Sequence, residues 1–162
     1  MKKENILKII KYLFIIYCIV LIFILFLSRA RRGNQFNLNV FSKEHFAMIN
    51  IIPFKTIFEF LERMSNSTIN RSIVVVNLAA NMLMFIPMGA ALPILFSKKF
   101  NKLWKTTLFV IGLVIVVEII QFITFCGSAD IDDLILNLLG GIIGYGIIKI
   151  KLLRKFLKLD EQ

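Results

Sequence analysis

The sequence predicts an all-α, polytopic membrane protein, built as a four-transmembrane-helix bundle with an amphipathic interfacial helix in the first extracellular loop. The chain has 162 residues, of which 58% are hydrophobic, and its mean hydropathy is +0.81. Soluble domains are about 45–50% apolar, so the excess is expected to face lipid. The net charge is +10, but the basic residues flank apolar runs, as expected beside anionic headgroups, so we expect no nucleic-acid partner.

Four apolar runs account for the predicted spans, and residues 1–162 are expected to form a single membrane domain. The spans cover about residues 6–28, 73–96, 106–126 and 134–150. The first run is longer than the apolar part of a signal peptide and no small-x-small site follows it, so we predict an uncleaved anchor. The fourth has roughly 15 uncharged residues, or about 22 Å at 1.5 Å per residue, and Lys149 and Lys151 can snorkel to complete it.

The charges of the short loops predict the orientation in the membrane. Residues 97–105 hold four lysines and no acid, residues 149–162 are basic, and residues 127–133 hold three aspartates and no base. The positive-inside rule then places both termini in the cytoplasm, although three arginines just after the first span oppose it. We therefore predict a multi-pass membrane protein with an extracellular segment over about residues 29–72.

That extracellular segment contains the predicted interfacial helix, in the stretch PFKTIFEFLERM. Pro53 suits the first position of a helix. One face of the helix would carry the apolar residues Phe54, Ile57, Phe58 and Leu61, whereas the charged residues lie mostly elsewhere. This pattern is typical of a helix that lies on a membrane surface, here the outer one.

A set of polar side chains is predicted to form an outward-facing intramembrane pocket. Its members are Asn77, Asn81, Glu118, Gln121, Asp130, Asp133 and Asn137. Pairs three or four residues apart share one helix face. Counting 1.5 Å per residue from the outer helix ends places the Asn, Gln and Glu members about 5–12 Å deep, in one layer.

Several of these features also have a purely structural explanation. Asn and Gln side chains join helices, and Gly140 and Gly144 permit close helix contact. Pro87 and Pro93 are expected to bend the second span. Asp130 is also placed to cap the fourth helix.

Glu118 is the residue that a structural explanation fits least well. A carboxylate at this depth costs roughly 2.5 kcal/mol or more unless it is paired or protonated. No Lys or Arg lies in the interior of the predicted spans. Glu118 is therefore expected to be protonated and hydrogen-bonded to Asn81 or Gln121, or else charged against a visiting cation.

Four motifs, in this order, resemble the VanZ-like family of small bacterial membrane proteins. They are NIIPF at 50–54, N-x-x-x-N-x-x-x-F-I-P-x-G at 77–89, E-I-I-Q-F at 118–122 and D-I-D-D-x-I-x-N-x-x-G-G at 130–141. The resemblance covers about residues 50–146. It departs from the family at Gly127 and Ser128, where many relatives carry an arginine shortly before the aspartates.

The resemblance implies a role in low-level resistance to teicoplanin and other lipoglycopeptides, which act at the outer face of the membrane. The first hypothesis is a non-enzymatic cell-envelope protein whose partners are membrane lipids or a lipid-linked cell-wall precursor. The alternative is a membrane enzyme acting on a phospholipid or polyprenyl-phosphate-type headgroup. In it Asp130, Asp132 and Asp133 would hold a divalent cation and Glu118 would be the catalytic base. Transport has the least support, because the polar layer does not continue inward.

Overall fold

The structure, a computed structural model, describes residues 3–27, 46, 49–65, 71–124 and 128–150. These residues form five α-helices and one π-helical turn, and they contain no β-strand. The elements are α1 (Lys3–Ile22), η1 (Phe23–Leu27), α4 (Lys55–Ser65), α5 (Arg71–Leu95), α6 (Leu103–Ile123) and α7 (Ile131–Ile148). The prediction of an all-helical chain is therefore confirmed over the part that the structure describes.

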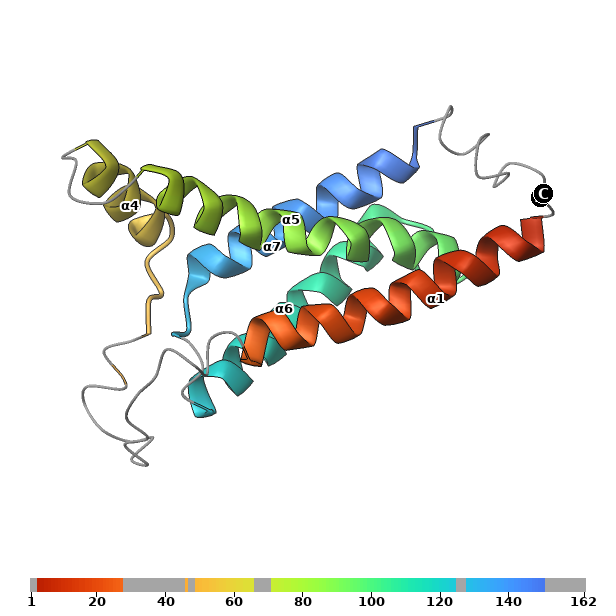
Figure 1. The fold of residues 1–162 in the computed structure, drawn as a ribbon, viewed down its shortest axis with the longest axis horizontal. Helices are drawn as coiled ribbons and strands as arrows, with labels where there is room; N and C mark the ends of the chain where they lie inside the picture. The colour runs from red at the N-terminus through yellow and green to blue at the C-terminus, as the bar shows by residue number, and fades with distance from the viewer. Residues whose placement is uncertain (1–2, 28–45, 47–48, 66–70, 125–127, 151–162) are drawn as a thin grey trace.

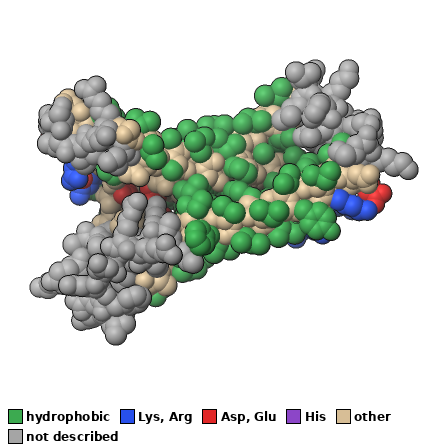
Figure 2. Space-filling model, viewed as in Figure 1, with side chains coloured by type: hydrophobic (Ala, Val, Ile, Leu, Met, Phe, Trp, Pro, Cys, Tyr) green, Lys and Arg blue, Asp and Glu red, His purple; other side chains and the backbone are tan. Residues whose placement is uncertain are grey.

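Four long helices run alternately up and down the bundle (Figure 1). The segments Glu4–Phe26, Val75–Leu95, Leu103–Ile123 and Ile131–Ile148 are long and apolar enough to cross a membrane. Figure 2 shows hydrophobic side chains over the middle of the visible face and charged side chains toward its two ends. The short helix α4 and the starts of α5 and α7 lie at one end, and the start of α1 lies at the other (Figure 1).

One helix start agrees with the prediction and one differs from it. The fourth helix begins at Ile131, as expected if Asp130 is its cap, and the Asp130 side chain accepts from the backbone N–H of Asp132 at 2.9 Å. The short helix α4 begins at Lys55, so Pro53 and Phe54 precede it. Phe54 has φ of 65°, in the left-handed region, which cannot continue a right-handed helix.

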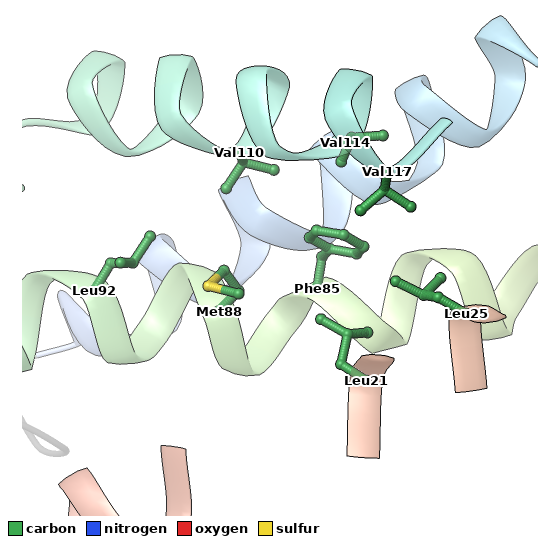
Figure 3. Packing of buried hydrophobic residues seen from close by; sticks show 8 residues of the cluster. All are labelled: Leu21, Leu25, Phe85, Met88, Leu92, Val110, Val114 and Val117. Atoms are coloured by element: carbon green, nitrogen blue, oxygen red, sulfur yellow. The ribbon is translucent and has the colours of Figure 1, made fainter. Parts of the chain in front are cut away.

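A cluster of buried apolar side chains joins α1, α5 and α6 (Figure 3). It consists of Leu21, Leu25, Phe85, Met88, Leu92, Val110, Val114 and Val117. Figure 3 shows the ring of Phe85 pointing from α5 toward Val114 and Val117 of α6. The valines recur every three or four residues, which places them on one face of α6.

The helices α5 and α7 make the closest contact in the bundle, and glycines make it possible. A Cβ built on Gly140 would lie 1.9 Å from the carbonyl oxygen of Met82, and one on Gly144 would lie 2.1 Å from that of Ile86. A Cβ on Gly89 would lie 1.9 Å from the carbonyl oxygen of Gly141. The glycines therefore allow the backbones of α5 and α7 to touch. The helix α5 continues through Pro87 and Pro93 without ending at either proline.

Candidate functional site

The close approach of α5 and α7 brings polar side chains together at the end of the bundle where α7 begins. The amide Nδ2 of Asn81 donates a hydrogen bond to Oδ1 of Asp133. One turn further along α7, Asn137 is 4% exposed, and its Oδ1 atom has no hydrogen-bond partner. Buried polar atoms in native proteins are nearly always hydrogen-bonded. The unpartnered oxygen is therefore an acceptor whose hydrogen bond a water or a ligand would have to supply.

Glu118 reaches the same region from α6. Its side chain is 9% exposed, and Oε2 accepts a hydrogen bond from the backbone N–H of Asp130 at 3.3 Å. Asp130 is the N-cap residue of α7. The N-terminus of a helix carries a partial positive charge that stabilises a nearby carboxylate. A backbone donor at a helix terminus thus stabilises the Glu118 carboxylate and offsets part of the energetic cost of burying it.

Gln121, one turn after Glu118, connects α6 to the first span. It is fully buried, and its Nε2 donates to the carbonyl oxygen of Leu25 at 2.8 Å. Leu25 lies in the π-helical turn η1, near the end of the helix, where carbonyl groups lack intrahelical partners. This contact gives Gln121 a structural role that its position on α6 did not reveal.

Two of the three aspartates hold the segment that precedes α4. Asp132 is 1% exposed, and its two carboxylate oxygens accept from the backbone N–H groups of Phe54 at 2.5 Å and Ile57 at 3.1 Å. Asp130 accepts from Asn50 Nδ2 at 2.9 Å and from the hydroxyl of Thr56 at 2.6 Å. We call Asn50, Thr56, Asp130 and Asp132 the clamp.

Backbone hydrogen bonds reinforce the clamp. The N–H of Asn50 donates to the carbonyl of Ala129 at 2.8 Å, and the N–H of Ile131 donates to the carbonyl of Asn50 at 2.9 Å. The motifs at 50–54 and 130–133 are therefore one structural unit, although they are far apart in the sequence. Asn50 and Thr56 were missed by sequence reasoning. The available signal was Asn50, the one polar residue in the family motif NIIPF at 50–54, with Thr56 two residues after that motif.

The remaining predicted site residue, Asn77, is exposed on α5 one turn before Asn81. Within the described residues, no three Asp, Glu, His or Cys side chains come together in a way that could hold a metal ion. Among the candidate metal ligands, Asp130 and Asp132 each use both carboxylate oxygens to accept hydrogen bonds from the protein. Glu118, Asp133 and Asn137 are other predicted site residues at this end of the bundle, and among them Asn137 has a buried oxygen without a partner. We call these three residues, with Asn81, the polar seam.

Comparison with known proteins agrees with this architecture. The model of the VanZ/LLP1 family matches residues 14–154. Protein VanZ from Enterococcus faecium is 33% identical over 116 residues, which cover 70% of this chain and 62% of that protein. The chain thus spans about three fifths of the length of this curated relative. No solved structure matches. The family match covers most of the sequence, so the chain belongs to the VanZ/LLP1 family.

Proposed function

We propose that this protein is a cell-envelope membrane protein that gives low-level resistance to teicoplanin and related lipoglycopeptides. In this proposal the polar seam binds the headgroup of a lipid or of a lipid-linked cell-wall precursor. Membership of the family and the similarity to Protein VanZ support the resistance role. The observation that carries the binding role is the buried Oδ1 of Asn137 without a partner, one turn from Asp133.

The chemistry of the polar seam favours a ligand that donates hydrogen bonds. Its buried amide oxygen on Asn137 has no partner, and Glu118 and Asp133 add two carboxylates to the same region. Hydroxyl and ammonium groups of headgroups are matching donors. The polar seam lies in the first turns of α7 and in the part of α6 near its end, close to one end of the spans. Headgroups reach this depth without crossing the hydrocarbon core.

The proposed orientation places the polar seam toward the outside of the cell. Lys98, Lys99, Lys102 and Lys105 lie in the connection between α5 and α6 and in the first turn of α6, at the end of the bundle opposite the aspartates. Lysine-rich short loops favour the cytoplasmic side. Both termini would then be cytoplasmic, and α4 would lie on the outer membrane surface, where lipoglycopeptides act.

The metal-assisted alternative receives less support from the geometry. It requires the aspartates at 130–133 to offer free oxygens to a divalent cation. Asp132 instead uses both oxygens to hold the backbone of Phe54 and Ile57. A cation could compete for this site only by disrupting the first turn of α4.

Mass spectrometry of co-purifying lipids tests the proposal. The wild type, Glu118→Gln and Glu59→Gln would be purified in the same mild detergent, and the bound amphiphiles would be quantified. Glu59 is an exposed acid on α4 and is the matched control. We expect one amphiphile to be enriched in the wild type and the control and to be reduced at least about tenfold in Glu118→Gln, the factor for about 1.4 kcal/mol. Identical lipid profiles in all three proteins would refute headgroup binding at Glu118.

A further inference from the structure

The short helix α4 has three distinct sides. Successive residues are about 100° apart around a helix. One side carries the half-buried residues Ile57, Phe60 and Met64, and the opposite side carries the exposed charged residues Lys55, Glu59, Glu62 and Arg63. A third side, between these two, exposes Phe58 and Leu61. These three sides suit a helix that touches protein with its half-buried side, water with its charged side and lipid with its exposed apolar side.

The turn before α4 also exposes large apolar side chains. Ile51 is 76% exposed, Ile52 is 58% exposed and Phe54 is 50% exposed, and Phe58 on α4 is 67% exposed. Such large apolar side chains on a segment outside the spans are costly in water, because burial of apolar surface is the main favourable term in folding. Several exposed apolar residues within so short a segment favour an interaction surface.

The clamp fixes the height of this surface relative to the membrane. The backbone of Asn50 pairs with Ala129 and Ile131, and Ile131 is the first residue of the fourth span. Asp132, in the first turn of the same span, holds the N–H groups of Phe54 and Ile57. Figure 1 shows the segment before α4 beside the start of α7. The exposed apolar residues therefore lie level with the end of a transmembrane helix, where the hydrocarbon core meets the headgroups.

We propose that Ile51, Ile52, Phe54, Phe58 and Leu61 form a lip that inserts into the bilayer interface, with lipid acyl chains as its partner. The clamp joins these residues to the start of a helix that is apolar enough to cross a membrane, which favours lipid as their partner. Aromatic and aliphatic side chains on one side and charged side chains on the other are the pattern of interfacial helices. The clamp holds the lip rigidly, including Phe54 in its unfavourable left-handed conformation. The inference does not depend on which ligand the polar seam binds.

Tryptophan fluorescence in vesicles with brominated lipids tests the lip. Trp104, the single tryptophan, would first be replaced by phenylalanine. Phe58→Trp, Ile51→Trp and the control Glu59→Trp would then be reconstituted separately in phosphatidylcholine that carries bromine near the headgroup end of its acyl chains. The control lies one residue from Phe58 but on the charged side of α4.

We expect quenching of the Phe58→Trp and Ile51→Trp variants to be at least about twofold stronger than quenching of Glu59→Trp. Equal quenching of all three variants would overturn the lip. Blue-shifted emission of the Phe58→Trp variant without quenching would also overturn it, because this result would place protein, from a second copy or from the same chain, over the surface.

Discussion

Replacing Gly140 with alanine adds one methyl group at the closest contact between α5 and α7. Its Cβ would lie 1.9 Å from the carbonyl oxygen of Met82. Carbon–oxygen contacts are ordinarily about 3.3 Å or longer, so the helices would have to separate locally by about 1.4 Å. Neither atom belongs to a flexible side chain, so a rotamer change cannot relieve the clash. The separation would also weaken the nearby hydrogen bond between Asn81 and Asp133.

The expected loss of stability follows from this displacement. Overpacking of a close-packed interface costs about 1–3 kcal/mol, and a gap of 0.5–1 Å already forfeits about a quarter to a half of the dispersion energy of the affected contacts. We take about 3 kcal/mol for this contact, because its partner is backbone. Alanine regains about 1 kcal/mol in helix propensity. The net destabilisation is about 2 kcal/mol, or about 5 °C in melting temperature by the scaling for chains of this size.

Thermal unfolding in detergent, followed by size-exclusion chromatography or circular dichroism, measures this effect. Gly112→Ala on α6 is the matched control, because its added Cβ would have no neighbour within 4 Å other than its chain neighbours and the backbone of its own helix. It should unfold at the temperature of the wild type or slightly above. If Gly140→Ala and Gly112→Ala unfold at the same temperature, the tight contact between α5 and α7 is refuted, together with the placement of Asn81 beside Asp133.

Three further predictions follow from the same contacts. Asp132→Ala should destabilise the protein by about 2 kcal/mol in the same unfolding assay, since two backbone N–H groups lose their acceptors; an unchanged melting temperature would argue against the clamp. Asn137→Ala should change stability by less than about 1 kcal/mol, because its buried Oδ1 makes no hydrogen bond within the protein. It should nevertheless lose the co-purifying amphiphile, and retention would remove Asn137 from the polar seam. In a cysteine-free background, Ser128→Cys should react with a membrane-impermeant reagent in intact cells and Asn101→Cys only after permeabilisation; the reverse pattern would contradict the proposed orientation.

The sequence predicted the four spans well because hydropathy and length depend on local composition. The predicted second span at about 73–96 and the observed helix Arg71–Leu95 differ by only one or two residues at each end. The fourth apolar run was placed at about 134–150, because an apolar run excludes the acids at 132 and 133, but the helix itself was expected to begin after a cap at Asp130, as it does. Those acids can lie inside the helix because Asp130 caps it and because Asp132 and Asp133 find donors on other segments.

The polar contacts were harder to predict because their partners lie far away in the sequence. Spacing along α6 put Glu118 and Gln121 on one face, but it could not show that Gln121 donates to Leu25 in the first span. Asn50 and Thr56 belong to the clamp through partners more than 70 residues away. Depth counting put Asn81, Glu118 and Asn137 in one layer, but it did not predict the contact between Asn81 and Asp133, because it gives no information on the direction of a side chain.

The measurement that tests the central proposal most directly is teicoplanin susceptibility of bacteria that produce the wild type or Glu118→Gln at equal membrane abundance. Glutamine keeps an oxygen that can accept from the backbone N–H of Asp130 but cannot carry a charge. Its burial in the bundle is also easier than that of a carboxylate. We therefore predict a melting temperature equal to or above that of the wild type together with loss of protection against teicoplanin. Full protection by a well-folded Glu118→Gln variant would contradict a functional role for the polar seam.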